Sequence, residues 1–193
     1  MNAPALHPPV PEPDRVSFSP VFEGLLREHR ATLSATAVSR LRDAGIDVSK
    51  PLLAAYPYRA WRAAVRILAE EQYPAVPYEA AVREVGRDFM RGYFETTLGR
   101  TVLVVLRLLG PRRSLQRMSR NFRTGNNFSE TWMHEDAPGD VRLEVNDALA
   151  DVPTFIQGLI EVVLEKVGAE DASVEVLAPA PNGHDLYRVR WKV

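Results

Sequence analysis

Positive charge is concentrated in one segment of this chain. Residues 96–129 carry seven arginines and no acidic residue, although the 193-residue chain has a formal net charge of −1. Guanidinium groups placed together are typical of a site for an anion or an acidic partner, and equally of helices whose arginines meet carboxylates from elsewhere in the fold. The seven arginines are Arg100, Arg107, Arg112, Arg113, Arg117, Arg120 and Arg123.

Three of these arginines share one face of a predicted helix. Arg113, Arg117 and Arg120 are separated by four and three residues, which is the spacing of neighbours on an α-helix. Such a stripe indicates either a solvated face or a surface that binds an anionic ligand or an acidic partner. Nucleic acid is disfavoured as that partner, because the rest of the chain cancels the local positive charge.

Other side chains that support chemistry form no recognisable motif. The histidines, at positions 7, 29, 134 and 184, lack the spacing of metal ligands, and the chain contains no cysteine. His134 and Glu135 are adjacent on a predicted strand, so their side chains point to opposite faces. No nucleophile, phosphate-loop or dinucleotide motif occurs. We therefore expect no catalytic residue, no metal site and no cofactor, and hence a protein that is not an enzyme.

The longest predicted helix contains three glycines. It covers residues 77–109 and includes Gly86, Gly92 and Gly99. A glycine inside a helix costs about 1 kcal/mol relative to alanine, so each requires a structural reason. Gly92, Thr96 and Gly99 fall on one face, which indicates close packing of another helix, a bend, or the wall of a narrow channel for an apolar ligand. With the arginine stripe, these three residues are the candidate ligand or partner site.

The hydrophobic pattern changes from helical to alternating near residue 125, which predicts an α+β fold. N-terminal helices are followed by a β-β-α-β-β antiparallel sheet with one buried and one solvent-exposed face. Charges of both signs on the exposed face predict cross-strand pairs. The predicted helices cover residues 22–30, 34–45, 57–72, 77–109, 111–123 and 151–167, and the predicted strands cover 128–135, 140–146, 173–177 and 186–193.

The composition fits a single folded domain. With 46% apolar and 25% charged residues, a chain of this length buries one substantial core. The proline-rich residues 1–19 predict a disordered lead, and residues 20–193 form the predicted domain. The absence of cysteine fits a reducing compartment, so we expect a cytoplasmic location. The most apolar run, residues 101–110, is about half as long as a membrane-spanning helix, so no membrane span is expected.

Several motifs resemble those of a known group of proteins. They are AYPYRAW at 55–61, VGRDFMRGYFETTLGR at 85–100, LLGPRRSL at 108–115, NNFSE at 126–130 and YRVRW at 187–191. Through them the chain resembles a large myxobacterial paralogous family of uncharacterised proteins, over most of residues 20–193. This resemblance implies no particular function.

A more remote resemblance rests on the order of elements, N-terminal helices followed by a β-β-α-β-β tail. The arrangement is similar to the 4-vinyl reductase, TRAPP-subunit and haem-NO-binding-associated group of domains, which implies a ligand-sensing or assembly module with a pocket for a small molecule or an acyl chain. Some members bind metal through cysteines, which this chain lacks. The resemblance implies one candidate haem ligand, His29, which lies on a predicted helix. Glu28 and Arg30 flank it, which favours a packed or partly exposed histidine that binds no haem.

These observations predict a non-enzymatic ligand-sensing or scaffold module for a small apolar or anionic ligand. The alternative is a subunit of a homo-oligomer or of a hetero-complex, which predicts an exposed apolar face on the helix between residues 92 and 109. An enzyme ranks third, because it requires a polar cluster that converges in a cleft.

Overall fold

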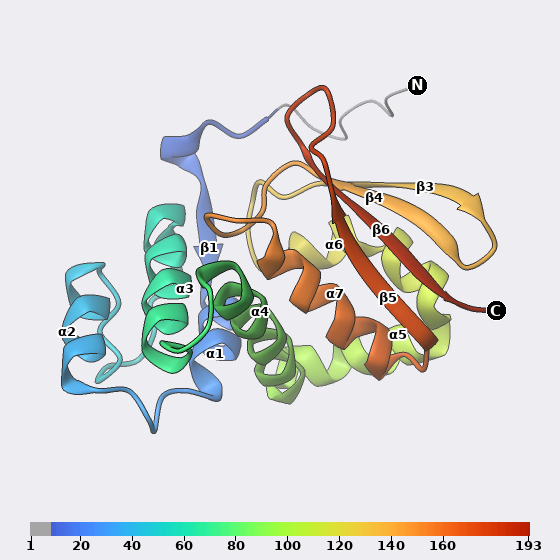
Figure 1. Cartoon of the computed structure of the whole chain (residues 1–193). Helices are drawn as coiled ribbons and strands as arrows, with labels where there is room; N and C mark the ends of the chain where they lie inside the picture. The colour runs from blue at the N-terminus through green and yellow to red at the C-terminus, as the bar shows by residue number, and fades with distance from the viewer. Residues whose placement is uncertain (1–8) are drawn as a thin grey trace.

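The computed structural model describes residues 9–193, which form one α+β domain (Figure 1). Over these residues the chain has seven α-helices and two antiparallel sheets, which confirms the predicted α+β class. The helices are α1 (Ser19–Arg27), α2 (Ala35–Asp43), α3 (Tyr58–Gln72), α4 (Tyr78–Glu95), α5 (Thr97–Gln116), α6 (Met118–Phe122) and α7 (Thr154–Lys166). The strands are β1 (Val16–Phe18), β2 (Ala55–Pro57), β3 (Thr131–Ala137), β4 (Asp140–Val145), β5 (Glu170–Leu177) and β6 (Asp185–Lys192).

The larger sheet confirms the predicted β-β-α-β-β tail. Its order is β3-β4-β6-β5, and all neighbouring strands are antiparallel. Val141, Leu143 and Val145 on β4 are fully buried, because every second side chain of a strand points to the same face. Helix α7 packs beside β5 (Figure 1), and Tyr187 Oη on β6 donates a 2.9 Å hydrogen bond to the carbonyl oxygen of Pro153 before α7.

The opposite face of this sheet carries pairs of opposite charge, as predicted. Arg142 Nε lies 2.8 Å from Asp136 Oδ2, and Arg188 Nη2 lies 2.6 Å from Asp140 Oδ2. The hydrogen bonds from these arginines lower the pKa of both carboxyl groups. Because the arginine side chains are partly exposed to solvent, which screens their charges, such pairs contribute little to stability and chiefly keep this face polar.

Helix α4 is the central helix and contacts α1, α3, α5 and α7. Two of its glycines permit close approach. A Cβ atom at Gly86 would lie 2.2 Å from the carbonyl oxygen of Phe155 on α7, and one at Gly92 would lie 2.4 Å from the carbonyl oxygen of Gly24 on α1. No side chain fits at either distance, so these two glycines let α7 and α1 pack directly against the backbone of α4.

Aromatic rings from different helices fill the centre of the core. Trp61 on α3 packs edge-to-face against Phe22, Phe89 and Phe155, with ring centroids 5.4, 5.4 and 5.8 Å away. Edge-to-face pairs of this kind add stabilisation beyond the burial of apolar area. The indole therefore joins α1, α3, α4 and α7 into one hydrophobic core.

The single helix predicted over residues 77–109 is wrong, because the chain breaks at Thr96. Its backbone is extended, with φ −70° and ψ 161°, and its hydroxyl oxygen accepts a 3.0 Å hydrogen bond from the backbone N–H of Gly99. Threonine is a favoured N-cap, so α5 starts anew there. A Cβ atom at Gly99 would lie 1.7 Å from the carbonyl oxygen of Tyr93. Gly92, Thr96 and Gly99 therefore lie at a helix junction and do not share one continuous face.

A second break lies inside α5, at the predicted Gly110–Pro111 boundary. Gly110 has φ 70° and ψ 177°, a conformation that glycine adopts readily. The helix predicted over residues 111–123 is also divided, because Arg117 leaves the helical conformation between α5 and α6. None of the helices in the described part of the chain combines the length and the apolar character needed to cross a membrane.

The disordered lead predicted for residues 1–19 differs from the structure where the two can be compared. Residues 1–8 lie outside the described residues. Residues Glu12–Asp14 form a 3-10 turn, and β1 pairs with β2 through Ser17 and Tyr56. The ordered part of the chain thus begins before residue 20. The sequence pattern did not predict this small sheet, because each of its strands has only three residues.

Candidate functional site

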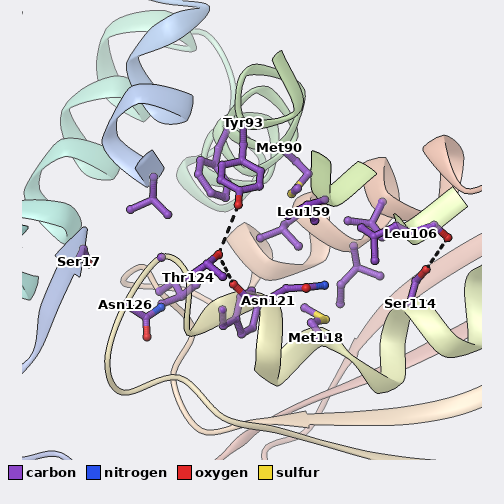
Figure 2. Close-up of a pocket in the computed structure, with 18 of the residues that line it drawn as sticks. Ser17, Met90, Tyr93, Leu106, Ser114, Met118, Asn121, Thr124, Asn126 and Leu159 are labelled. Atoms are coloured by element: carbon purple, nitrogen blue, oxygen red, sulfur yellow. Dashed lines mark hydrogen bonds between the residues drawn. The ribbon is translucent and has the colours of Figure 1, made fainter. Parts of the chain in front are cut away.

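An apolar cavity of about 70 Å³ lies between α4, α5, α6 and α7 (Figure 2). Each helix turns a buried apolar side chain toward it. These side chains are Met90 on α4, Leu106 on α5, Met118 on α6 and Leu159 on α7. Two of the four are methionines, whose flexible thioethers adapt to differently shaped neighbours.

The break in α5 shapes one wall of the cavity. The hydroxyl of Ser114, beyond the break, donates a 3.1 Å hydrogen bond to the carbonyl oxygen of Leu106, before it. This bond joins the two segments of α5 across the turn at Gly110. The short segment after Gly110 is thereby held against the first part of α5, and both segments line the cavity.

Polar groups gather at one end of the cavity. Tyr93 Oη lies 3.4 Å from Thr124 Oγ1, which donates a 2.7 Å hydrogen bond to the backbone carbonyl of Asn121 (Figure 2). Because the Thr124 hydroxyl hydrogen is engaged there, Tyr93 is the donor in the longer contact. Burial raises the pKa of Tyr93, so its phenol stays protonated at neutral pH.

The Asn121 side chain is a polar group available to a ligand. Its carboxamide makes no hydrogen bond with any residue in the described range, and Figure 2 shows it extending between Leu159 and Met118. Asn126, which also lines the cavity, differs: its Oδ1 accepts hydrogen bonds from the backbone N–H groups of Phe128, at 3.1 Å, and Ser129, at 2.8 Å. Asn121 thus retains both a donor and an acceptor.

The six residues predicted from the sequence lie outside the lining of this cavity. Arg113, Arg117 and Arg120 are exposed, and none of them has an ion-pair partner between residues 9 and 193. Gly92, Thr96 and Gly99 are buried at the α4–α5 junction described above. The structure therefore does not bring the arginine stripe and the glycine positions together into one site.

Two neighbouring arginines have carboxylate partners instead. Arg112 pairs with Glu135 at 2.6 Å, and Arg123 pairs with Glu130 at 2.9 Å. Two arginines of the segment thus form ion pairs with β3 or with the residue directly before it. The others face solvent. The interpretation that arginines of this segment meet carboxylates is confirmed for Arg112 and Arg123, and binding of an anion or an acidic partner by the exposed arginines stays a prediction.

Sequence reasoning does not find the cavity, because its lining comes from segments spread between residues 17 and 163. Met90 and Leu159, taken singly, have the pattern of ordinary core positions on amphipathic helices. A space between such side chains depends on how the helices pack, which periodicity does not report. Asn121 in a segment otherwise rich in arginine is the one local signal, and it is a weak one.

A second buried polar cluster lies away from the cavity. His29 is 5% exposed, and its Nε2 lies 3.3 Å from Asp88 Oδ2 without hydrogen-bond geometry. Burial lowers the pKa of His29 against the opposing effect of Asp88. Asp88 also accepts a hydrogen bond from the Tyr73 hydroxyl. Among residues 9–193, no three histidine or acidic side chains are grouped so that they could hold a metal ion.

Known proteins are similar to this chain over nearly its whole length. A family model described as protein of unknown function (DUF2378) matches residues 15–192. No curated protein matches the sequence. An H-NOX protein from S. oneidensis in the Fe(II)NO ligation state is similar in structure, with a TM-score of 0.66 and 10% identity over 91% of this chain and 99% of that chain. The Fe(II) unliganded H-NOX protein from K. algicida has a TM-score of 0.62 and 12% identity over 90% and 95%. At such identities the likeness establishes the fold alone.

Proposed function

The chain belongs to the DUF2378 family of proteins of unknown function, and we propose that it is a non-enzymatic ligand-sensing module for a small, mostly apolar molecule. The observation that carries this proposal is the apolar cavity between α4, α5, α6 and α7. The fold likeness to H-NOX proteins, one of which is described in an Fe(II)NO ligation state, supports a sensing role.

Haem, which the neighbouring structures suggest, does not fit the cavity of this chain. Histidine and cysteine, two common ligands of haem iron, are absent among the described residues that line the cavity, and the lining residues of a type that can ligate iron are Met90, Tyr93 and Met118. The lining also includes no charged side chain that could pair with the haem carboxylates. At about 70 Å³, the cavity is smaller than the cavity of about 150 Å³ that accepts benzene in another protein.

The cavity favours a ligand of a few atoms that carries one polar group. Methionine side chains at positions 90 and 118 allow it to widen modestly. The unpaired Asn121 carboxamide can donate to a carbonyl or ether oxygen and can accept from a hydroxyl. A short alcohol, ketone or aldehyde satisfies both the apolar wall and this single polar position.

Filling the cavity provides the mechanism for sensing. The lining combines α4 and α7 from the core with α6 and both segments of broken α5. A ligand that adds contacts to all of them stabilises their present arrangement relative to any other. The signal would then be a change in the position or order of the α5–α6 segment.

Native mass spectrometry of the purified protein, with extraction of bound small molecules and lipids, tests this proposal. Thermal unfolding with a panel of short alcohols, ketones and aldehydes provides a second readout. Val163→Phe fills the cavity and should abolish any ligand-induced rise in unfolding temperature. Val176→Phe, on β5 and outside the lining, is the matched control and should leave that rise intact. If nothing co-purifies and no compound raises the unfolding temperature of the natural chain, the ligand proposal is wrong.

A protein-interaction subunit is the second candidate, and one observation favours it. The segment expected to expose an apolar face does so: Val104 is 59% and Leu108 is 83% exposed. Sedimentation at high protein concentration measures self-association. A monomer at all concentrations, together with loss of folding in Val104→Asp or Leu108→Asp, would count against a homo-oligomer.

A further inference from the structure

Helix α5 is apolar on the side that faces solvent as well as on the side that faces the core. Among the described residues, seven large apolar side chains are exposed, and four of them are on this helix: Leu98, Val104, Val105 and Leu108. The inner side carries Val102 and Leu106 against the cavity. A group of exposed apolar side chains on one helix is typical of a surface that binds a partner. In Figure 1, α5 runs along the lower edge of the molecule.

The outward side chains have the spacing of a helix-packing seam. Thr97, Thr101, Val104 and Leu108 are exposed and follow one another at intervals of four, three and four residues. This is the pattern of alternating positions in the seam between two packed helices. The side chains of Thr97 and Thr101, at the first two positions, are small and allow another backbone to approach closely. The seam extends over about three turns, or roughly 16 Å.

Positive charge flanks one edge of this seam. Arg100 and Arg107 are seven residues apart, so they lie at equivalent positions beside it. Arg100 is exposed and has no ion-pair partner in the described part of the chain. Arg107 Nε donates a 3.2 Å hydrogen bond to the backbone carbonyl of Lys166, which fixes the side chain but leaves its charge uncompensated. The other edge, with Leu98 and Val105, is apolar.

We propose that this outer face of α5 docks an amphipathic helix of a partner protein whose apolar seam is flanked by acidic residues. The proposal rests on the protein-interaction candidate above and specifies the chemistry of its partner. A second copy using the same face is disfavoured, because residues 96–129 carry no carboxylate to meet the arginines of the other copy. Opposite charges beside a helix seam select the partner and its orientation.

A pair of synthetic peptides tests the charge of the partner. The first is an amphipathic helix of about 20 residues, with leucine at the seam positions and glutamate at the flanking positions. The second has lysine in place of each glutamate. Fluorescence anisotropy should show binding of the glutamate peptide at least about tenfold tighter than binding of the lysine peptide. The difference should shrink as salt rises from about 50 mM to about 300 mM, because salt screens charges at the surface.

Two variants locate the peptide on the protein. Val104→Ser with Leu108→Ser should weaken binding of the glutamate peptide at least about tenfold. Arg100→Gln with Arg107→Gln should remove the preference for glutamate over lysine. The control is Leu53→Ser with Arg59→Gln, which changes an exposed apolar and an exposed basic residue elsewhere and should leave binding unchanged. Circular dichroism establishes that each variant keeps its fold.

Other outcomes overturn the proposal in distinguishable ways. Equal binding of the two peptides, or no binding of either, rejects the acidic helix. The protein can also be tested on vesicles: if it binds phosphatidylglycerol vesicles but not phosphatidylcholine vesicles, and the Val104 and Leu108 variant loses this binding, the face is assigned to a membrane surface. A dimer that this variant dissociates would assign it to a second copy. The dimer would reject the acidic partner and retain the interaction function.

Discussion

The indole nitrogen of Trp61 donates a 2.7 Å hydrogen bond to the backbone carbonyl of Leu149. The two residues lie 88 positions apart, and both line the cavity. Leu149 has a φ of 59°, which is uncommon for a residue with a side chain. The bond holds this left-handed residue in place and ties the loop before α7 to α3.

Trp61→Phe should therefore destabilise the fold. The change leaves the carbonyl of Leu149, which is buried, without its donor, at a cost of about 1–3 kcal/mol, in addition to the loss of packing. Urea unfolding measures the difference in the free energy of unfolding. Trp132→Phe is the control, since Trp132 is half-buried and stacks on His184 at a centroid distance of 5.1 Å. A smaller effect at Trp61 than at Trp132 would contradict the role of the hydrogen bond.

Gly92→Ala should separate α1 from α4. The added Cβ would lie 2.4 Å from the carbonyl oxygen of Gly24, and backbone atoms can relieve that overlap only if the helices move. Overpacking of this kind costs about 1–3 kcal/mol, which exceeds the gain in helix propensity of alanine over glycine. Thermal unfolding should show a lower midpoint for this variant. Ala80→Ser, at an exposed position of α4, should leave the midpoint nearly unchanged.

Stability should fall on mild acidification because of His29. Burial, opposed by Asp88 and Glu28, lowers the pKa of His29 below its ordinary value of 6.5. The unfolded chain therefore takes up a proton at a pH where the folded chain does not, and this favours unfolding as the pH falls through that ordinary value. The free energy of unfolding, measured by urea between about pH 8 and pH 5, should drop more steeply for the natural chain than for His29→Gln. Parallel curves for the two proteins would show that His29 does not contribute.

Replacement of Arg113, Arg117 and Arg120 by glutamine should leave the fold intact. All three are exposed and lack ion-pair partners within residues 9–193, so their charges contribute little to folding. The triple variant should elute from a phosphocellulose column at lower salt than the natural chain, because it has lost three exposed positive charges. Arg62→Gln is the contrasting variant, since Arg62 Nη2 lies 2.6 Å from Asp151 Oδ1 and its Nε is buried, so this single change should lower stability more than the triple change does. Unfolding of the triple variant would show that the three arginines are structural.

The strands of the larger sheet could be predicted because their pattern is local. Val141, Leu143 and Val145 alternate with charged residues, and a strand turns alternate side chains to opposite faces whatever its surroundings. The break at Thr96 could not be predicted in the same way. Threonine is tolerated inside a helix and favoured at an N-cap, and the choice depends on where α4 must end to pack against α1 and α7.

The sequence by itself determined the alternation of the strands, the amphipathic helices and the concentration of arginine between residues 96 and 129. These features depend on residue type and spacing along the chain, which the periods of helix and strand convert directly into faces. Only the tertiary structure decided that Arg112 meets Glu135 while Arg113 faces solvent. It also decided that α5 lines a cavity with one side and leaves the other uncovered. Those outcomes depend on contacts between residues far apart in the chain, and local periodicity carries no information about such contacts.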